Sequence, residues 1–338
     1  MQRLPGSAPE TMQIAPMDNA VTTENELRAH PAVCAWNQIA DSNSFPRRIS
    51  ALNRSGRGKA QVYRLAGIGP SGEDICAKRS NFKNLEIERA IYQDVLPQLP
   101  LTAVTCYGLC RDKDPRRGWL FVEDAGDKKY ESGTREQKIA FTEWLAHLHG
   151  LAARLPAGRF ADRGPKHYFK ALQLAREQLK HSISNPALGP DDVAVLGDLL
   201  EQGGAIERRW DEVETFCSTL AGTLVHGDLM PKNVRVRPGA SGIAILVLDW
   251  EMAGWAVPAA DLERADLAVY GSVVNALGMR IAHRDIEMLA VYGKLFRLIA
   301  SVEWDSQWLK TKVVEQSMFN LRVYREQLGR LLDGEGWR

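Results

Sequence analysis

The sequence predicts an α+β protein in which a small antiparallel sheet precedes a mainly helical region. Short runs of strand composition follow one another between residues 49 and 78, separated by glycine-rich connections, which is typical of antiparallel strands. From about residue 134 the apolar residues recur instead at helical spacing. A further strand pair, with the turn formers PGASG at its centre, interrupts the later helical stretches. These observations favour a two-lobed molecule with a β-hairpin inside its helical lobe.

The composition is that of an ordinary globular protein. Its 338 residues, 45% of them hydrophobic, are enough to build a core in each of two lobes. The 43 Lys and Arg and the 42 Asp and Glu give a formal net charge of +1, which provides no electrostatic footprint for nucleic acid or an anionic membrane. We therefore expect neither as a partner, and the sequence leaves the oligomeric state open.

The first twenty residues resemble neither a signal peptide nor an amphipathic basic leader, and no stretch approaches membrane-spanning length. We expect a disordered leader followed by one extra helix over Thr23–Ala40, with Thr23 and Glu26 as a capping box and Pro31 as an interruption. Five scattered cysteines lack the partners of a zinc site, and reduced thiols are usual in the cytoplasm. The sequence thus predicts a cytoplasmic protein.

Three strand-like runs come next, and a glycine-rich connection joins the first two. The runs are 49–52, 61–65 and 74–78. The bare backbone around Ser55, Gly56 and Gly58 is suited to close over phosphates. The connection lacks the full GxGxxG pattern, and a plain hairpin turn would also need glycine, so both interpretations stay open.

The third run ends at Lys78, and a helix is predicted to start almost at once after it. If Lys78 works inside a cleft, a carboxylate must hold its ammonium group. Glu88 of the predicted helix is the preferred partner, and Glu86 is the alternative. An exposed lysine at the end of a strand is the purely structural interpretation.

A short apolar strand, Trp119–Val122, runs into Glu123 and Asp124 and resembles the hinge between the lobes of a two-lobed protein. Extended backbone N–H and C=O groups can bind a purine there whatever the side chains are. The predicted parts of the chain are a leader with an extra helix, a sheet-containing lobe that ends at the hinge, and a helical lobe: 1–45, 46–125 and 126–338.

Helical periodicity dominates the rest of the chain and is expected to supply the walls of a substrate cleft. Gly203 and Gly204 are expected to interrupt one helix. His147 and His149 lie two residues apart on a helix and so point in different directions, which argues against a metal site. The predicted helices cover 134–155, 167–184, 191–220, 265–277, 283–302 and 308–332.

The run HGDLMPKN contains the most informative residues of the chain. Phosphoryl transfer needs a carboxylate that orients the attacking hydroxyl and accepts its proton, and oxygen ligands that hold Mg²⁺ on the phosphates. Asp228 and Asn233, five residues apart in an HxDLxxxN pattern, are of those types. Folding the following strand pair about Ala240 places Asp249 roughly opposite Pro231 and close to Asn233. The spacing therefore predicts two oxygen ligands around one metal ion.

HGDLMPKN together with LDWEMAGWAVPAADL resembles the Brenner-type motif and metal loop of the aminoglycoside phosphotransferase and choline kinase family, the small-molecule branch of the protein-kinase-like bilobal fold. The resemblance implies that Asp228 is the catalytic base and that Asn233 and Asp249 bind magnesium. It also implies that Asp261 is a buried carboxylate that braces the catalytic loop, and that His226 is a structural anchor of that loop.

The same resemblance assigns the nucleotide site. It implies that Lys78, held by Glu88, contacts the α and β phosphates of ATP, and that adenine binds the backbone near Glu123 and Asp124. Glu251, two residues after the metal aspartate, is a candidate for a second metal or a substrate contact. Tryptophans in this region are more often core than ligand sites, although a substrate role stays open for Trp250, Trp255, Trp304 and Trp308.

The prediction is an enzyme that transfers the γ-phosphate of ATP, with Mg²⁺, to a hydroxyl of a small molecule such as an aminoglycoside-like or other antibiotic. A choline-type or sugar-type metabolite is the alternative acceptor. Acidic and basic residues are nearly balanced after residue 250, which argues against a polycationic acceptor. A protein serine/threonine kinase would need a longer peptide-docking segment than WEMAGWAVPAADL. A nucleotide-binding protein without turnover would not need the base, the metal ligands and the lysine together.

Overall fold

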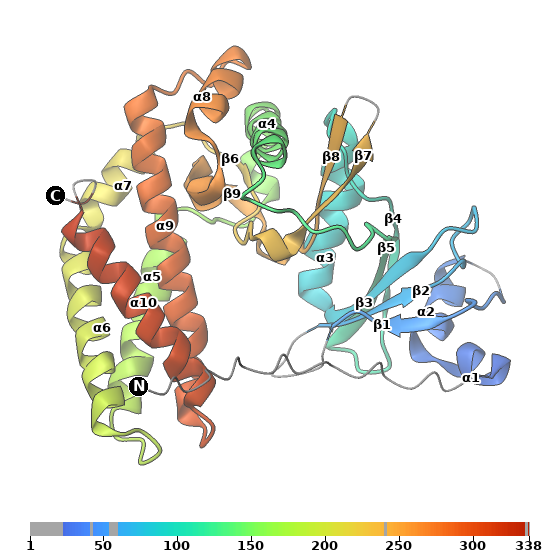
Figure 1. Cartoon of the computed structure of the whole chain (residues 1–338), viewed down its shortest axis with the longest axis horizontal. Helices are drawn as coiled ribbons and strands as arrows, with labels where there is room; N and C mark the ends of the chain where they lie inside the picture. The colour runs from blue at the N-terminus through green and yellow to red at the C-terminus, as the bar shows by residue number, and fades with distance from the viewer. Residues whose placement is uncertain (1–22, 41–42, 54–59, 240–241, 335–336, 338) are drawn as a thin grey trace, which may run out of the picture.

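The structure is a computed structural model, and it describes residues 23–40, 43–53, 60–239, 242–334 and 337. A five-stranded antiparallel sheet lies at one end of the molecule and a group of long helices at the other (Figure 1). The predicted α+β, two-lobed fold is therefore confirmed. The strands of the sheet, in spatial order, are β1 (Ile49–Ala51), β2 (Gln61–Leu65), β3 (Ile75–Asn81), β5 (Arg117–Glu123) and β4 (Cys106–Arg111).

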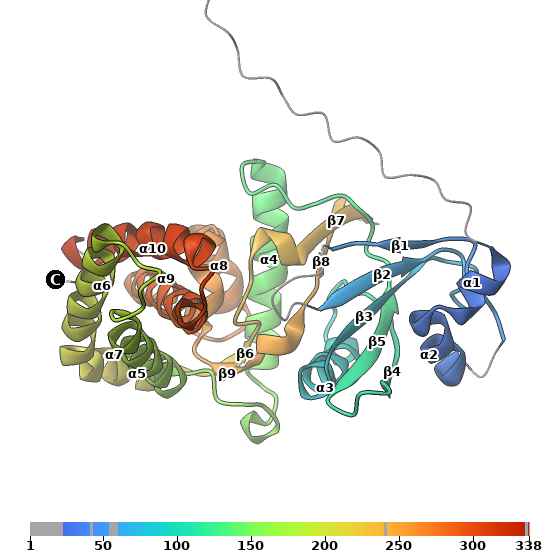
Figure 2. The same cartoon turned by 90° about the horizontal axis from the view of Figure 1, so that it is seen from below.

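Two short helices cover the outer face of this sheet (Figure 2). They are α1 (Glu24–Ala29) and α2 (Pro31–Ala40). The predicted capping box is present, because Thr23 and Glu26 each accept the backbone N–H of the other. Pro31 does not merely interrupt one helix but opens a second, where its missing N–H has no cost. Trp36 of α2 packs against Phe121 of β5, with ring centroids 5.4 Å apart. This segment is thus part of the core of the sheet lobe.

The inner face of the sheet looks toward the other lobe and carries the side chains that matter for function. Along β3, Ile75 and Ala77 join the apolar cluster under α2, whereas Cys76 and Lys78 point to the opposite face. The strand is longer than predicted, because its residues continue to pair with β5 as far as Asn81. Lys78 therefore lies inside the strand rather than at its end.

A helix, α3 (Phe82–Ala90), starts directly after β3, as expected, and lies between the two lobes (Figure 1). The side chain of Asn81 caps it by accepting the N–H of Lys83. A π-helical turn, Ile91–Val95, continues it, and such turns occur often at functional sites. Through α3 the sheet lobe contacts the segment Trp250–Met252 of the helical lobe. The strand β4, which follows α3, was not predicted from the sequence.

The helical lobe is built from amphipathic helices, of which α5 is an example: its buried residues Tyr168, Leu172, Ala175 and Leu179 recur at helical spacing. No helix in the described ranges is long and apolar enough to cross a bilayer. The helices of this lobe are α4 (Arg135–Ala152), α5 (Pro165–Ser182), α6 (Pro190–Arg208), α7 (Trp210–Ser218), α8 (Leu267–Ala276), α9 (His283–Ser306) and α10 (Glu315–Asp333).

Two predictions about these helices are wrong. The glycine pair does not interrupt α6, because Gly203 is packed against the preceding helix: a Cβ there would lie 3.1 Å from the Arg176 side chain of α5. The chain breaks instead at Arg209, between α6 and α7. The last helix begins at Glu315 rather than at residue 308, because a 3₁₀ turn, Gln307–Lys310, precedes it.

The predicted hairpin is present as β7 (Val234–Gly239) and β8 (Gly242–Val247). Its register pairs Gly239 with Gly242. Extended beyond the last pair of the hairpin, the same register places residue 249 opposite residue 232. The prediction, opposite Pro231, was one residue off, because the connection has two residues rather than one. A second strand pair, β6 (Thr223–Val225) with β9 (Gly254–Ala256), holds the chain on either side of the hairpin.

Candidate active site

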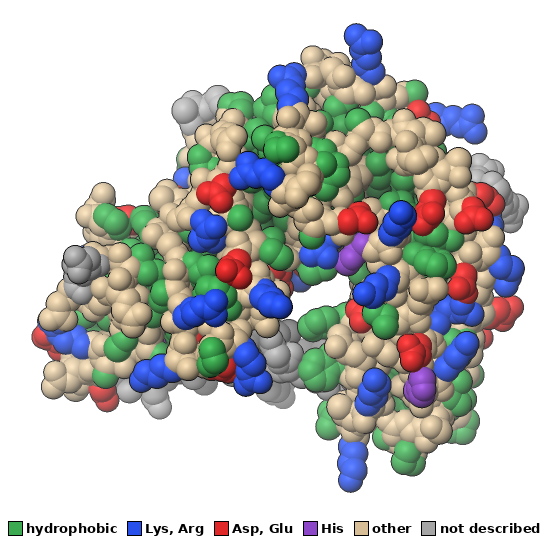
Figure 3. Space-filling view, turned by 180° about the vertical axis from the view of Figure 1, so that it is seen from behind, with side chains coloured by type: hydrophobic (Ala, Val, Ile, Leu, Met, Phe, Trp, Pro, Cys, Tyr) green, Lys and Arg blue, Asp and Glu red, His purple; other side chains and the backbone are tan. Residues whose placement is uncertain are grey.

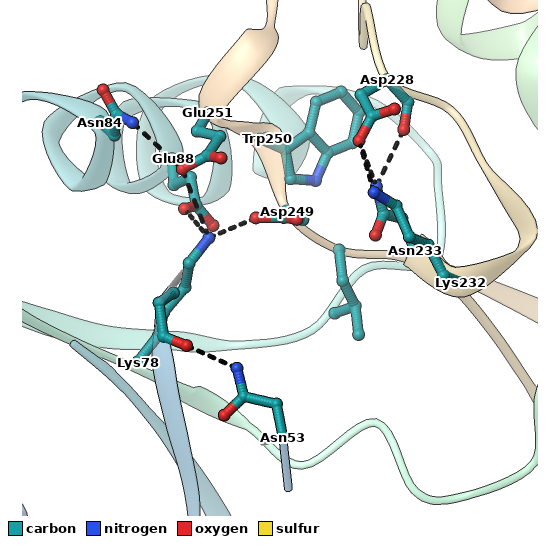
Figure 4. Close-up of polar contacts among 12 residues, drawn as sticks. Asn53, Lys78, Asn84, Glu88, Asp228, Lys232, Asn233, Asp249, Trp250 and Glu251 are labelled. Carbon is teal, nitrogen blue, oxygen red and sulfur yellow. Dashed lines mark hydrogen bonds and ion pairs between the residues drawn. The ribbon is translucent and has the colours of Figure 1, made fainter. Parts of the chain in front are cut away.

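Lys78 is at the centre of the first group of predicted site residues (Figure 4). Its ammonium forms ion pairs with Glu88 and Asp249 and lies 3.9 Å from a Glu251 oxygen. Burial disfavours the charged ammonium, but the three carboxylates outweigh this and raise the pKa of Lys78. The sheet supplies the lysine, α3 supplies Glu88, and the chain after β8 supplies Asp249 and Glu251. Residues of both lobes therefore meet at one ammonium group.

The partner of Lys78 is Glu88 and not Glu86, which is exposed on α3. Glu88 is 2% exposed, and this burial raises the pKa of its carboxyl group to about 7, although Lys78 opposes the shift. A carboxylate in such a place is costly without its cation. Glu88 is therefore stable as a carboxylate only while the Lys78 ammonium stays beside it.

We expect Glu88→Gln to lower kcat/KM for ATP about 10- to 100-fold, because a hydrogen bond to a charged group contributes roughly 1.5–3 kcal/mol. Glu86→Gln is the matched control, since it makes the same change two residues away on the exposed face of α3. Initial-rate kinetics with varied ATP measures both. Equal effects of the two substitutions would contradict the assignment of Glu88 as the residue that holds Lys78.

Asp228 and Asn233 form the second group, on the loop before β7. The Asn233 side-chain amide donates to the Asp228 carbonyl at 2.8 Å and to the Asp228 carboxylate at 3.2 Å. Because the amide nitrogen is used in this way, the side-chain oxygen of Asn233 is the atom left for a cation. Figure 4 shows Asp249 between Lys78 and Asn233, so the two groups form one site.

Lys232 is a site residue that sequence reasoning missed. Its ammonium lies 3.1 Å from the Asp228 carboxylate, and its side chain is 66% exposed. An ion pair this exposed adds little to stability, so its place beside the candidate base is the more informative fact. Its position inside HGDLMPKN was the only feature of the sequence that could have indicated a role for Lys232 in the site.

Asp261 holds the predicted catalytic loop, residues 226–233, from inside the helical lobe. Its carboxylate accepts the backbone N–H of His226 at 2.7 Å and that of Gly227 at 3.0 Å. His149 of α4 lies 3.3 Å from the same carboxylate, and the Tyr270 hydroxyl is 2.9 Å from the other ring nitrogen. Burial would raise the pKa of Asp261, but the hydrogen bonds and charges of His149 and His226 lower it. His149 is thus a buried histidine that contacts the Asp261 carboxylate, a contact that the sequence did not predict.

His226 links the catalytic loop to the segment after β8. Its Nδ1 accepts the N–H of Asp228 at 3.2 Å, and its Nε2 lies 3.0 Å from the carbonyl oxygen of Leu248. The ring also packs on Trp250, with centroids 4.7 Å apart. Every ring position is therefore used for structure, which is the geometry of an anchor rather than of an acid or base.

Asp249 has a left-handed backbone conformation, with φ 70° and ψ 55°. Residues other than glycine rarely adopt it, and such strained positions cluster at active sites. The flanking contacts fix it: the N–H of Leu248 donates to the Asn233 carbonyl at 2.8 Å, and Trp250 is fully buried. The carboxylate of Asp249 is thereby held toward the interlobe space.

The oxygen atoms of this site suit a magnesium ion. Ligand atoms of Glu88, Asp249 and Glu251 all lie within 4.8 Å of one another, and the amide oxygen of Asn233 is nearby in Figure 4. Carboxylate and amide oxygens are the ligands that Mg²⁺ prefers. Glu251 also accepts a hydrogen bond from Asn84 of α3 at 3.2 Å, so it too connects the lobes.

The predicted hinge residues use their side chains for structure. Glu123 forms an ion pair with Arg237 of β7, and Asp124 forms one with Arg64 of β2. The backbone N–H groups of both residues already donate to protein carbonyl oxygens. A base bound at this segment would therefore have to use other backbone groups. The predicted phosphate-loop residues Ser55, Gly56 and Gly58 lie outside the described residues.

A hollow beside Asp228 lies on the side of the catalytic loop that faces α5 and α9. Its polar lining includes Tyr168, Glu263 and Arg297, the last two joined as an ion pair, and Met230 adds an apolar surface. Figure 3 shows an opening between the two lobes, with acidic and basic side chains and one histidine along its upper rim. A molecule placed in the hollow would touch the candidate base directly.

The four tryptophans have different surroundings. Trp250 is fully buried and is therefore core rather than ligand surface. Trp255 stacks on Phe160, with ring planes 13° apart. Trp304 is 54% exposed and meets Trp308 edge to face.

A family model described as the phosphotransferase enzyme family matches residues 75–287. The chain belongs to this family. It is therefore a small-molecule phosphotransferase, and the matched range includes Lys78, the catalytic loop and Asp261. No curated protein matches the sequence.

Solved structures with the same fold include other phosphotransferases. One is a putative aminoglycoside phosphotransferase from Ralstonia eutropha (16% identity, TM-score 0.56, 90% of this chain and 96% of that one). Another is choline kinase from Cryptosporidium parvum (13% identity, TM-score 0.54, 84% and 90%). A third is a GDP and kanamycin complex of an aminoglycoside phosphotransferase (12% identity, TM-score 0.60, 87% and 98%). At these identities the likeness establishes the protein-kinase-like fold.

Proposed function

We propose that this phosphotransferase moves the γ-phosphate of ATP to a hydroxyl group of a small molecule, with Asp228 as the general base. The observation that carries the proposal is the meeting of Lys78, from the sheet, with Asp249, from the hairpin, beside the loop of Asp228 and Asn233. These are the residue types that phosphoryl transfer uses, gathered from both lobes around one space.

In this proposal each side chain has a separate task. Lys78, held by Glu88, neutralises the α and β phosphates. Asn233 and Asp249 would hold Mg²⁺, which supplies positive charge to the phosphate oxygens when it is bound. Asp228 orients the acceptor hydroxyl in line with the γ-phosphate and accepts its proton as the new bond forms.

The acceptor binds in the hollow beside Asp228. Solved relatives include enzymes named for aminoglycosides and for choline, and one was solved with kanamycin, so hydroxylated antibiotics and amino alcohols are the first candidates. Tyr168, Glu263 and Arg297 line the hollow and would make the contacts that select the acceptor.

The proposal is tested by ADP release from ATP in the presence of a panel of hydroxylated acceptors of different charge, with phosphorylated products identified by mass spectrometry. We expect acceptor-dependent release that stops when Mg²⁺ is removed by EDTA and returns when excess Mg²⁺ is added, because the donor set of the site is made of oxygen atoms. Acceptor-dependent turnover that persists in EDTA would contradict the assignment of Asn233 and Asp249.

A further inference from the structure

Close to the catalytic loop, a partly buried arginine forms no ion pair with any carboxylate in the described part of the chain. Arg163 lies just before α5. Its Nε donates to the carbonyl oxygen of Met252 at 2.9 Å, and one terminal nitrogen lies 3.5 Å from His167 Nδ1. By contrast, Arg237 and Arg297, also partly buried at the cleft, each form an ion pair with a glutamate.

Arg163 is held in an environment that disfavours its charge. Burial lowers the pKa of its guanidinium group, and the neighbouring Tyr168 and Asp162 offset this only in part. Arginine nevertheless keeps its proton in proteins, so the positive charge remains. A charge that has lost part of its water and has no counterion gains most from a ligand that brings a negative group.

The position of Arg163 is next to the catalytic loop. The Met252 carbonyl that it binds also packs against the residue before Asp228, since a Cβ on Gly227 would lie 2.6 Å from that oxygen. Tyr168 lines the hollow together with Asp228. Burial raises the pKa of Tyr168, the charge of Asp228 raises it further, and the charge of Arg163 lowers it. The guanidinium therefore lies within electrostatic range of a side chain that lines the hollow.

Besides Tyr168, the ionisable neighbours of Arg163 are a histidine, a lysine and one aspartate. His167 and Lys170 follow it by four and seven residues, so they share one face of α5. Burial lowers the pKa of His167, and the charges of Arg163 and Lys170 lower it further while Asp162 raises it, so the imidazole is neutral near pH 7 and the positive charges here are those of Arg163 and Lys170. This face of the helix favours an anion beside the cleft.

We infer that the acceptor of this phosphotransferase carries an anionic group, a carboxylate or a phosphate, which Arg163 binds while a hydroxyl of the same molecule reaches Asp228. The inference rests on the proposed function. In the transfer, the acceptor oxygen forms a bond to the γ-phosphorus as the bond from that phosphorus to the β–γ bridging oxygen breaks. The hydroxyl proton goes to Asp228 and ADP leaves. The planar guanidinium suits two parallel hydrogen bonds to either anion.

The test uses acceptors that share one carbon skeleton and differ only in charge: a hydroxy acid, its neutral amide, the corresponding amino alcohol, and the matching polyol phosphate. ADP release by the full-length protein gives kcat and KM for each. We expect kcat/KM for at least one anionic member to exceed that of the amide about tenfold or more. The hydroxy acid and the polyol phosphate distinguish the two sources of negative charge.

Variants then link the preference to the residue. We expect Arg163→Gln to raise KM for the preferred anionic acceptor about 10- to 100-fold, to leave KM for the neutral amide within about twofold, and to change kcat little. Lys166→Gln is the matched control, because it removes the same charge from an exposed position on the first turn of α5. Arg163→Lys is the second variant, for use if the glutamine variant folds poorly. Because it keeps the charge but not the planar fork, it is expected to bind the anionic acceptor with an affinity between those of the unchanged protein and Arg163→Gln.

The outcomes separate this inference from the function on which it rests. Preference for the amino alcohol or the amide, with KM unchanged in the Arg163 variants, would overturn the anionic acceptor and leave the kinase activity intact. Absence of acceptor-dependent ADP release with every charge class would overturn the proposed function itself.

Discussion

Asp228→Asn is expected to lower the turnover number for acceptor phosphorylation by about two to four orders of magnitude, the range typical of a positioned general base. The substitution keeps the shape of the side chain, and an amide can still accept a hydrogen bond from Asn233, so the loop should keep its conformation. What is lost is the ability to take a proton from the attacking hydroxyl. Steady-state kinetics on the best acceptor of the panel measures the effect.

ATP binding provides the internal comparison for this variant. The phosphates are assigned to Lys78 and Asp249, which Asp228 does not contact in the structure, so we expect the ATP dissociation constant from isothermal calorimetry to change less than about threefold, or 0.7 kcal/mol. Asp191→Asn, an exposed carboxylate in the first turn of α6, is the control for a general effect of lost charge. A rate close to that of the unchanged protein would show that Asp228 is not the base.

The sequence was most informative where chemistry requires particular residues at a fixed spacing. The spacing of Asp228 and Asn233, the hairpin after them and the aspartate at its end were all read from residue types and turn signals, and the structure brings them together within one residue of the expected register. The partner of Lys78 was left open between two glutamates. Only burial distinguishes them, and burial depends on how α3 packs between the lobes.

Side-chain conformations and contacts between distant segments explain the features that the sequence did not predict. The contact of Lys232 with Asp228 depends on a side-chain conformation that no periodicity encodes. His149 is far from Asp261 in the chain and meets it only because α4 packs beneath the catalytic loop. In the same way, Gly203 continues α6 because a neighbouring helix needs the space, which overrides the helix-breaking tendency of glycine.

The segment predicted as the hinge has side-chain partners that the sequence did not indicate. The strand β5 runs into Glu123 and Asp124 as expected, yet both carboxylates form ion pairs that join this segment to β7 and β2. These pairs connect the segment to both lobes. A base bound at this segment would therefore have to use backbone groups other than the N–H groups of Glu123 and Asp124, which donate within the protein.

Asp261→Ala is expected to destabilise the protein by about 3–5 kcal/mol at neutral pH, the usual cost of removing one partner from a buried charged network. The substitution leaves the N–H groups of His226 and Gly227 buried without an acceptor, and it removes the carboxylate beside His149. Urea-induced unfolding measures the free energy of unfolding, and activity measured well below the unfolding midpoint reports separately on the catalytic loop.

A second aspartate five residues later is the natural control. Asp266 caps α8 by accepting the N–H of Val269 at 3.2 Å, and the loss of such a cap typically costs about 0.5–2 kcal/mol. Asp266→Ala should therefore destabilise clearly less than Asp261→Ala and leave the catalytic loop in place. Equal losses of stability and activity in the two variants would mean that Asp261 is an ordinary buried carboxylate rather than the brace of the loop.

The pH dependence of the Asp261 effect follows from the sign of its pKa shift. Its pKa is lower in the folded protein than the value of about 3.9 expected for an unfolded chain, so the folded state binds this proton less tightly. The stabilisation is therefore complete above about pH 4 and is lost as the pH falls through the lower, folded-state pKa. We expect the difference in free energy of unfolding between the unchanged protein and Asp261→Ala to be constant from neutral pH to about pH 5 and to shrink in more acidic solution. A difference that grew on acidification would reverse the sign and show that Asp261 is protonated in the folded protein, in which case it could not accept both backbone N–H groups as a charged brace.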